Sequence, residues 1–430
     1  MIAKTVILGA GPAGLTFSYK YKNQSVILEK DSRVGGLSKS IEILDGVFDL
    51  GGHSFHTPHN DVASLIHEVM GDNWHQQRRD AQVWMKGSLI PYPFQHHYQS
   101  LNDQTINDDC GSYHSNTIKT AESANFEEWI NNKFGPGISN HFMLPYNKKL
   151  WAHQLTDISC DWVNQRIATT KEPESNSNKN NKRQPLLADS KIGYPLHGGF
   201  GQIFEEISKH CSHICFGQYV NQIDVMNRTL TTISGDIWPW ETIVTTIPVT
   251  QLLRSIKHCP GSILELANNL KKVSLKILLV LARLNMNNTV IPHRIYIADP
   301  NIPPHKVAFN HTSSPLLLKR TNHAIMCEIS YSPSKPPLPN QDLTQQSIRW
   351  LVDAGITNSI ENIIQTRIID LPHGYPINTH TKADTVKKIK TFLRAHNIHT
   401  IGRFGAWDYA NSDECIHQGL ELAHEFNQSI

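Results

Sequence analysis

The sequence predicts an α/β protein built on a parallel sheet, and three observations support this prediction. Two short apolar runs, Thr5–Leu8 and Ser25–Leu28, flank a glycine-rich loop and a stretch over 15–22 that suits a helix. A strand, a helix and a second strand in this order form a βαβ unit with parallel strands. The length of 430 residues corresponds to roughly three domains of about 150 residues each. We therefore expect the βαβ unit to be one part of a larger fold.

The remaining elements are predicted in chain order. Residues 100–125 are polar and predict a surface loop, and helices are expected over 126–134 and 138–150. The polar stretch 171–190 predicts a mobile loop, with a role as a lid left open. Strands are then expected at 229–233, 243–247 and 273–281, a Pro-rich loop at 332–340, and helices at 343–354 and 414–427.

The composition excludes several classes of protein. Apolar residues make up 39% and charged residues 18%, as in a folded protein and unlike a disordered one. Forty Lys and Arg against 38 Asp and Glu give a charge of +2, so no basic surplus indicates a nucleic-acid partner. We expect no membrane-inserted segment and no signal peptide, because no apolar run is long enough and the first strand begins close to Met1. Seven scattered cysteines without a CxxC pair favour reduced thiols, a cytoplasmic location and no metal site.

The glycine-rich loop predicts a nucleotide site. Gly9, Gly11 and Gly14 match the pattern G-x-G-x-x-G, whose glycines allow a tight turn, close approach to a pyrophosphate and helix–strand packing. The N-terminus of the following helix offers N–H groups and a positive dipole end to phosphates. Glu29, at the end of the second strand, is placed to accept hydrogen bonds from ribose hydroxyls. This context predicts a Rossmann-like domain that binds a dinucleotide; the alternative is a glycine-rich turn without a ligand.

A second glycine pair favours FAD over NAD. Gly35–Gly36 follows Glu29 closely, which lets the backbone pass under a long dinucleotide. This E-x5-GG extension resembles flavoproteins of the amine oxidase, protoporphyrinogen oxidase and UDP-galactopyranose mutase group. Gly402–Gly405, followed by a helix with Gly419, resembles the second flavin-contacting segment of that group.

Motifs in the rest of the chain resemble UDP-galactopyranose mutases in particular. The resemblance runs from residue 1 to about 427 and is loose between 205 and 375. It is carried by PYPFQ at 91–95, FMLPYNKKLW at 142–151, GGHSFHT at 51–57 and GRFGAWDY at 402–409.

The resemblance implies an activity and its partners. These enzymes interconvert the pyranose and furanose forms of a nucleotide-diphosphate sugar without net redox change, and the N5 atom of reduced FAD acts as nucleophile at the anomeric carbon. The implied substrate is similar to UDP-galactose, the implied reductant is an external donor such as NAD(P)H, and the implied pathway is cell-surface polysaccharide synthesis. Whether the chain forms a homo-oligomer is left open.

The resemblance also implies residue roles. Catalytic roles are expected for His53, Arg166, Tyr375 and Tyr409. Substrate contacts are expected for Tyr92, Gln95, Phe142, Asn147, Trp151, Tyr296 and Lys306. Lys306 is included because the second phosphate-binding arginine of the family falls at His305–Lys306 in this chain. Together with the glycine-rich loop, cofactor contacts are expected for Gly9, Gly11, Gly14, Glu29, Lys30, Arg33, Gly36, Leu37, Ser38, Gly52, Arg403 and Asp413.

The expected architecture has three parts, and two alternative functions stay open. An FAD-binding Rossmann-like domain is expected from 1–80 with about 195–250 and 385–430, and a helical insertion from 100–170. An antiparallel sheet of six or so strands is expected to form the substrate domain from 80–99 and 250–385. The alternatives are an FAD-dependent oxidase or desaturase, and a flavin-binding scaffold without turnover in a polysaccharide assembly.

Overall fold

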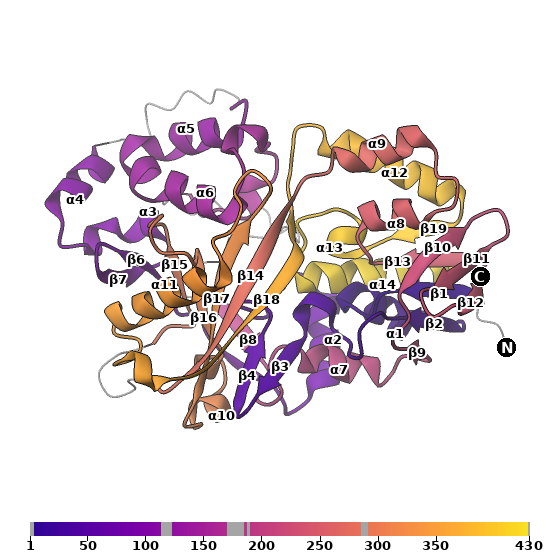
Figure 1. The fold of residues 1–430 in the computed structure, drawn as a ribbon, viewed down its shortest axis with the longest axis horizontal. Coiled ribbons are helices and arrows are strands. Elements are labelled where there is room, and N and C mark those ends of the chain that lie inside the picture. The colour runs from indigo at the N-terminus through magenta and orange to yellow at the C-terminus, as the bar shows by residue number, and fades with distance from the viewer. Residues whose placement is uncertain (1–3, 113–122, 170–184, 187–189, 285–290, 429–430) are drawn as a thin grey trace.

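Two sheets, each covered by helices on both faces, organise the chain (Figure 1). The computed structural model describes residues 4–112, 123–169, 185–186, 190–284 and 291–428. Most of the predicted loop at 171–190 therefore lies outside the described residues. The predicted α/β class with a parallel sheet is confirmed.

The parallel sheet has five strands in the order β19-β13-β1-β2-β9. Their bounds are Ile398–Thr400, Thr242–Thr245, Thr5–Leu8, Ser25–Leu28 and Ile214–Cys215. Successive side chains of a strand point to opposite faces, so Ile7 packs into one core while Val6 and Leu8 pack into another. Both faces are thus buried, which explains why these strands are uninterrupted apolar runs.

Helices from distant parts of the chain cover this sheet. Those that share the core of Ile7 are α1 (Pro12–Lys20), α2 (Asn60–Met70), α7 (Gln202–Ser208) and α14 (Ser412–Gln428). Those that share the core of Val6 are α8 (Val249–Ser255), α9 (Gly261–Asn268) and α12 (Lys382–Ala395). A small antiparallel sheet packs against the same core, with strands β10 (Val220–Asp224), β11 (Thr229–Thr232) and β12 (Ile237–Pro239).

The second sheet has seven strands in the order β18-β14-β17-β16-β15-β6-β7. Their bounds are Ile363–Pro376, Lys272–Ala282, His323–Tyr331, Lys306–Phe309, Arg294–Ile297, Ala81–Met85 and Ser88–Pro91. Five of its six strand pairings are antiparallel, as expected, and the pairing of β15 with β6 is parallel.

The long strand β14 shows why its sequence alternates poorly. Leu275, Ile277 and Leu279 face a helical layer, whereas Leu278 and Val280 face the core that includes side chains of α11 (Asn340–Asp353). Because both faces are buried, every position from Ile277 to Ala282 is apolar. The helical layer lies beside the sheet at the upper left of Figure 1. It contains α3 (Phe94–His97), α4 (Gln104–Gly111), α5 (Phe126–Ile138) and α6 (Leu144–Trp151).

Helix α4 corrects the expectation of a loop over 100–125. The Asp103 side chain accepts a hydrogen bond from the Ile106 N–H and caps the helix. Ile106 and Cys110 point into the core of the helical layer. Two buried side chains one turn apart therefore hold a helix whose other positions are polar, a pattern too sparse to stand out in the sequence.

The remaining α-helices and strands are short. They are β3 (Ser40–Ile43), β4 (Gly46–Asp49), β5 (His75–Arg78), β8 (Lys191–Tyr194), α10 (Pro315–Leu318) and α13 (Gly402–Gly405). All seven cysteines are free. Across the described ranges, we find no helix with the length and apolar character needed to span a bilayer.

Candidate functional site

A cavity of about 1080 Å³ joins the two sheets. Its lining combines the glycine-rich loop after β1, the loop after β4 and side chains of the seven-stranded sheet. Pockets for drug-sized ligands measure about 300–1,000 Å³, so this volume suits one large ligand or two adjoining ones. The carboxyl ends of β1 and β2 face the cavity, which is where ligands bind in open parallel sheets.

Two glycines of the loop are constrained in opposite ways. A Cβ atom at Gly14 would lie 2.2 Å from the carbonyl oxygen of Gly9, so this position must be glycine for helix and strand to pack. A Cβ atom at Gly11 would meet no protein atom within 4 Å. Gly11 lines the cavity, and its lack of a side chain keeps that space open for a ligand.

The first turn of α1 is suited to an anion. Gly11 caps the helix without a side-chain hydrogen bond, and Pro12 occupies its first position. The N–H groups of this turn have no partner within the helix and carry the positive end of its dipole. A phosphate at this point of the cavity would satisfy them.

Glu29 is held by the backbone of the neighbouring loops. Its Oε2 accepts a hydrogen bond of 2.7 Å from the Ala10 N–H, and its Oε1 accepts one of 2.9 Å from the Asp31 N–H. Burial raises the pKa of Glu29. Each carboxylate oxygen has a second lone pair for a ribose hydroxyl. The glycines, the helix end and Glu29 therefore fit the adenosine and pyrophosphate portion of a dinucleotide.

Gly52 and His53 lie where the cavity reaches the second sheet. The His53 ring stacks on Phe200 with ring centres 4.8 Å apart, and burial lowers the pKa of His53 to about 3. Its Nδ1 is buried and finds no hydrogen-bond partner among the described residues. A neutral imidazole with an unpartnered nitrogen at the cavity is a fitting contact for a ligand.

A buried ion pair lies beneath this loop. Lys306 and Glu328 are cross-strand neighbours on β16 and β17, and their charged atoms are 2.8 Å apart. Glu328 also accepts a hydrogen bond of 2.7 Å from the Gly52 N–H. Burial alone would raise the pKa of Glu328, but Lys306 and His305 lower it to about 2. The carboxylate is thus ionised and keeps the Lys306 ammonium charged at the cavity wall.

Tyrosines and arginines form another part of the wall. The rings of Tyr375 and Tyr409 lie 5.6 Å apart, and Arg403 stacks over Tyr375 at 5.3 Å. Arg166 stacks over Tyr409 at 4.9 Å and pairs with the Glu414 carboxylate at 2.7 Å. These stacked cations have fixed planes, which suits recognition of phosphate oxygens.

A third group includes residues that the sequence prediction missed. The Arg79 guanidinium stacks over Tyr92 at 4.8 Å and donates a hydrogen bond of 2.8 Å to the Tyr296 hydroxyl. Arg294 lines the same wall and donates to the Ser54 hydroxyl. Burial would raise the pKa of Tyr296, but Arg79 and Arg294 lower it to about 8.

Most of the predicted site residues reach the cavity. Those that line it are Gly9, Gly11, Glu29, Lys30, Gly36, Leu37, Ser38, Gly52, His53, Tyr92, Arg166, Tyr296, Lys306, Tyr375, Arg403, Tyr409 and Asp413. They come from segments spread over more than four hundred residues of the sequence. Their roles in binding or catalysis stay predictions.

Six predicted residues do not line the cavity. Gly14 packs against the backbone of Gly9, as described above. Arg33 points to the surface instead, where it pairs with Glu205 at 2.6 Å. The other four belong to the helical layer: Gln95, Phe142, Asn147 and Trp151.

Packing explains the positions of these four residues. The Gln95 amide donates to the Ala168 carbonyl oxygen, and the Asn147 amide donates to that of Met143. Phe142 stacks on Tyr146 with ring centres 5.2 Å apart. Trp151 packs edge-on against Tyr409 at 5.4 Å, so it supports a cavity residue without lining the cavity. These four side chains therefore pack around the cavity without lining it, and their expected substrate contacts stay predictions.

The sequence contains only weak signals for the site residues Glu328 and Arg79, which the prediction missed. Glu328 is a single acid within the apolar strand β17, where a buried charge requires a partner. Arg79 lies in a run of polar residues that resembles an ordinary surface loop. Neither pattern identifies the partner, because Lys306 and Tyr296 are distant in the sequence.

Comparisons with known proteins agree with this architecture. Residues 7–69 match the family model of an NAD(P)-binding Rossmann-like domain. A solved structure of reduced UDP-galactopyranose mutase is similar, with a TM-score of 0.89 and 24% sequence identity over 100% of this chain and 95% of that chain.

Two oxidases are also similar. A protein described as a protoporphyrinogen oxidase from Exiguobacterium sp. 255-15 has a TM-score of 0.73 and 16% identity, covering 99% of both chains. A putrescine oxidase with redesigned cofactor binding has a TM-score of 0.70 and 12% identity over 100% of this chain and 99% of that chain. The chain thus contains a Rossmann-like domain and has the fold that UDP-galactopyranose mutase shares with these oxidases.

Proposed function

We propose that this chain is an FAD-dependent, redox-neutral mutase that interconverts the pyranose and furanose forms of a nucleotide-diphosphate sugar. One observation carries the proposal: a single cavity connects the dinucleotide loop to a wall of cations and tyrosines. A dinucleotide cofactor and an anionic substrate would thus lie next to each other. In its reduced form, FAD supplies a nucleophilic nitrogen for attack on an anomeric carbon.

The cations of the wall suit a departing nucleotide diphosphate. Arg166, Arg403 and Lys306 line the cavity close to the two tyrosines described above. Guanidinium groups bind phosphate oxygens through two parallel hydrogen bonds, and a buried ammonium adds a point charge. Together they would stabilise the charge that develops when the bond between sugar and diphosphate breaks.

The tyrosines and His53 would act as neutral polar contacts. Burial raises the pKa of Tyr375, so its hydroxyl keeps its proton and donates hydrogen bonds at neutral pH. His53 remains uncharged because its pKa is low. An uncharged imidazole beside the cofactor would orient it without competing with the cations for the diphosphate.

The test is a chromatographic assay of purified protein with UDP-galactofuranose and a panel of nucleotide sugars. We expect pyranose product only after the flavin is reduced with dithionite, and NADH and NADPH should be compared as alternative donors. Absence of conversion in both redox states across the panel would contradict the proposal. Inactivated protein with dithionite is the control for chemical conversion.

The likeness to two oxidases favours one alternative, an FAD-dependent oxidase or desaturase. An oxidase acts from the oxidised flavin and passes electrons to oxygen. Oxygen uptake with an amine or a porphyrinogen, in the absence of mutase activity, would support this alternative. Mutase activity that requires reduction and consumes no oxygen would exclude it.

A further inference from the structure

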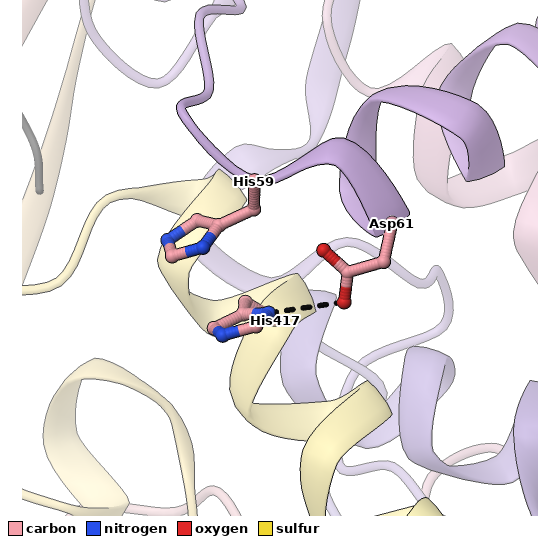
Figure 2. Close-up of side chains that lie close together, drawn as sticks. All are labelled: His59, Asp61 and His417. Carbon is pink, nitrogen blue, oxygen red and sulfur yellow. Dashed lines mark hydrogen bonds and ion pairs between the residues drawn. The ribbon is translucent and has the colours of Figure 1, made fainter. Parts of the chain in front are cut away.

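His59, Asp61 and His417 come together at a place where α2 meets α14, and the carboxylate of Asp61 approaches the His417 ring (Figure 2). His59 caps the N-terminus of α2, Asp61 lies in its first turn, and His417 belongs to α14. One potential ligand atom from each lies within 4.8 Å of the others. We propose that these three side chains bind a divalent transition-metal ion of the zinc type. The proposal does not rest on the mutase activity.

Binding one ion requires the two rings to turn, because an imidazole binds a metal through a lone pair in its own ring plane and the two planes are nearly parallel. The two imidazole rings are stacked with centres 3.8 Å apart, and Asp61 Oδ2 lies 3.1 Å from His417 Nδ1. In a tetrahedral zinc site, bonds of about 2.0 Å place neighbouring ligand atoms roughly 3.3 Å apart. The side chain of His417 is 26% exposed and that of Asp61 is 48% exposed, so both have room to turn.

Glu421 supplies a second observation that indicates a cation. It lies one helical turn after His417, and its Oε1 is 3.3 Å from His417 Nε2. A ring that donates its Nε2–H to a carboxylate presents a lone pair at Nδ1, as metal-binding histidines do. In this structure His417 Nδ1 and Asp61 Oδ2 are at hydrogen-bond distance, so a bound metal ion would take the place of the proton between these two atoms.

The adjacent second imidazole favours the metal over the proton. A proton on His417 would be shared with the neighbouring carboxylates alone, whereas a metal ion could bind the adjacent His59 ring as well. A metal ion binds both neutral rings and the carboxylate together. Two nitrogen ligands and one oxygen ligand suit Zn²⁺, Co²⁺ or Ni²⁺, whereas Mg²⁺ and Ca²⁺ prefer oxygen ligands alone.

The charges around the proposed metal ion and its position between α2 and α14 indicate that its role is structural. Asp61 and Glu421 compensate a dication, and Asp61 also offsets the positive end of the α2 dipole. The loop before His59 carries His53 at the cavity, and the first turn of α14 carries Asp413 there. A metal ion would link the loop before His59 to helix α14 from outside the cavity. It would stabilise their relative positions and take no part in catalysis.

The test compares metal binding by the full-length, tag-free protein and its variants. Co²⁺ and Zn²⁺ would be titrated into wild type and the double variant His59→Ala/His417→Ala, with d–d absorption and calorimetry as readouts. His424→Ala is the matched control, because His424 is exposed on the same helix. We expect wild type and the control to bind one more equivalent than the double variant.

Two further results sharpen the test. Zn²⁺ should raise the Tm of wild type and of the control but not that of the double variant, since a ligand that binds only the folded state stabilises it. Glu421→Gln should weaken Co²⁺ binding about 10- to 100-fold, the usual effect of losing such an orienting partner. Equal stoichiometry and equal Tm shifts in wild type and double variant would overturn the proposal.

Discussion

Lys306 and Glu328 face each other on adjacent strands, with 2.8 Å between the ammonium nitrogen and a carboxylate oxygen. The pair lies beneath the Gly52 N–H, which donates to the same carboxylate. It holds a cation at the cavity where the family resemblance led us to expect a phosphate-binding group. The carboxylate therefore determines whether this wall of the cavity carries a fixed positive charge.

Replacing Glu328 by Gln should destabilise the fold and weaken this charge. Removing one partner of a buried ion pair costs about 3 kcal/mol or more, because the other charge is left uncompensated. The free energy of unfolding, measured in urea, should fall by this amount. Glu265→Gln, at an exposed position of α9, is the control and should change little.

The effect of Glu328→Gln should depend on pH. Lys306 and His305 depress the pKa of this carboxyl to about 2 despite its burial. A carboxyl whose pKa falls on folding contributes stability above its ordinary pKa and loses that contribution as the pH falls towards its folded pKa. The stability difference between wild type and variant should therefore be constant near neutrality and shrink as the pH falls below about 4.5. A difference that stays constant down to pH 3 would contradict this assignment.

Tyr296 should ionise at lower pH than an ordinary tyrosine. Arg79 donates to its hydroxyl, and Arg79 and Arg294 together lower its pKa to about 8 although burial opposes this. Ultraviolet difference titration should show one phenolate transition near this value. Tyr296→Phe should remove the transition, and Arg79→Met should move it to higher pH. A transition unchanged in Arg79→Met would show that Arg79 does not control it.

Arg166 should matter for turnover if the proposed mutase activity is correct. Its guanidinium stacks over Tyr409 and is oriented by Glu414, which positions it at the cavity. Arg166→Ala should lower kcat/KM by about 10- to 150-fold, the equivalent of about 1.5–3 kcal/mol for a lost charge-assisted contact. Arg349→Ala, at an exposed position of α11, is the control. Unchanged kinetics in Arg166→Ala would remove this residue from the mechanism.

Two glycine variants should distinguish an effect on dinucleotide binding from an effect on folding stability. Gly11→Ala adds a methyl group where no protein atom lies within 4 Å, so the protein should fold normally but bind its dinucleotide poorly. Gly14→Ala places a methyl group 2.2 Å from the Gly9 carbonyl oxygen and should lower Tm. Thermal unfolding and the flavin absorbance of the purified variants would measure both effects. Normal flavin content in Gly11→Ala would argue against a pyrophosphate at this point.

Local patterns predicted a large part of the fold. Strands β1 and β2 and the glycine loop between them were predicted within a few residues, because turn glycines and apolar runs act through nearest neighbours. Strand β14 was recognised as an apolar run, although its poor alternation is explained only by burial on both faces. Helix α4 was missed because only two buried residues and one cap stabilise it, and so few apolar positions give no clear helical period in the sequence.

The sequence by itself determined the glycine-rich loop and the α/β class, and most of the site residues predicted from it line the cavity. Tertiary structure alone decided which side chains meet there. It turned Gln95 and Asn147 towards backbone carbonyls, placed Arg33 on the surface, and set Glu328 against Lys306. The physical reason is that local sequence sets backbone conformation and periodicity, whereas contacts between distant segments depend on how whole sheets and helices pack.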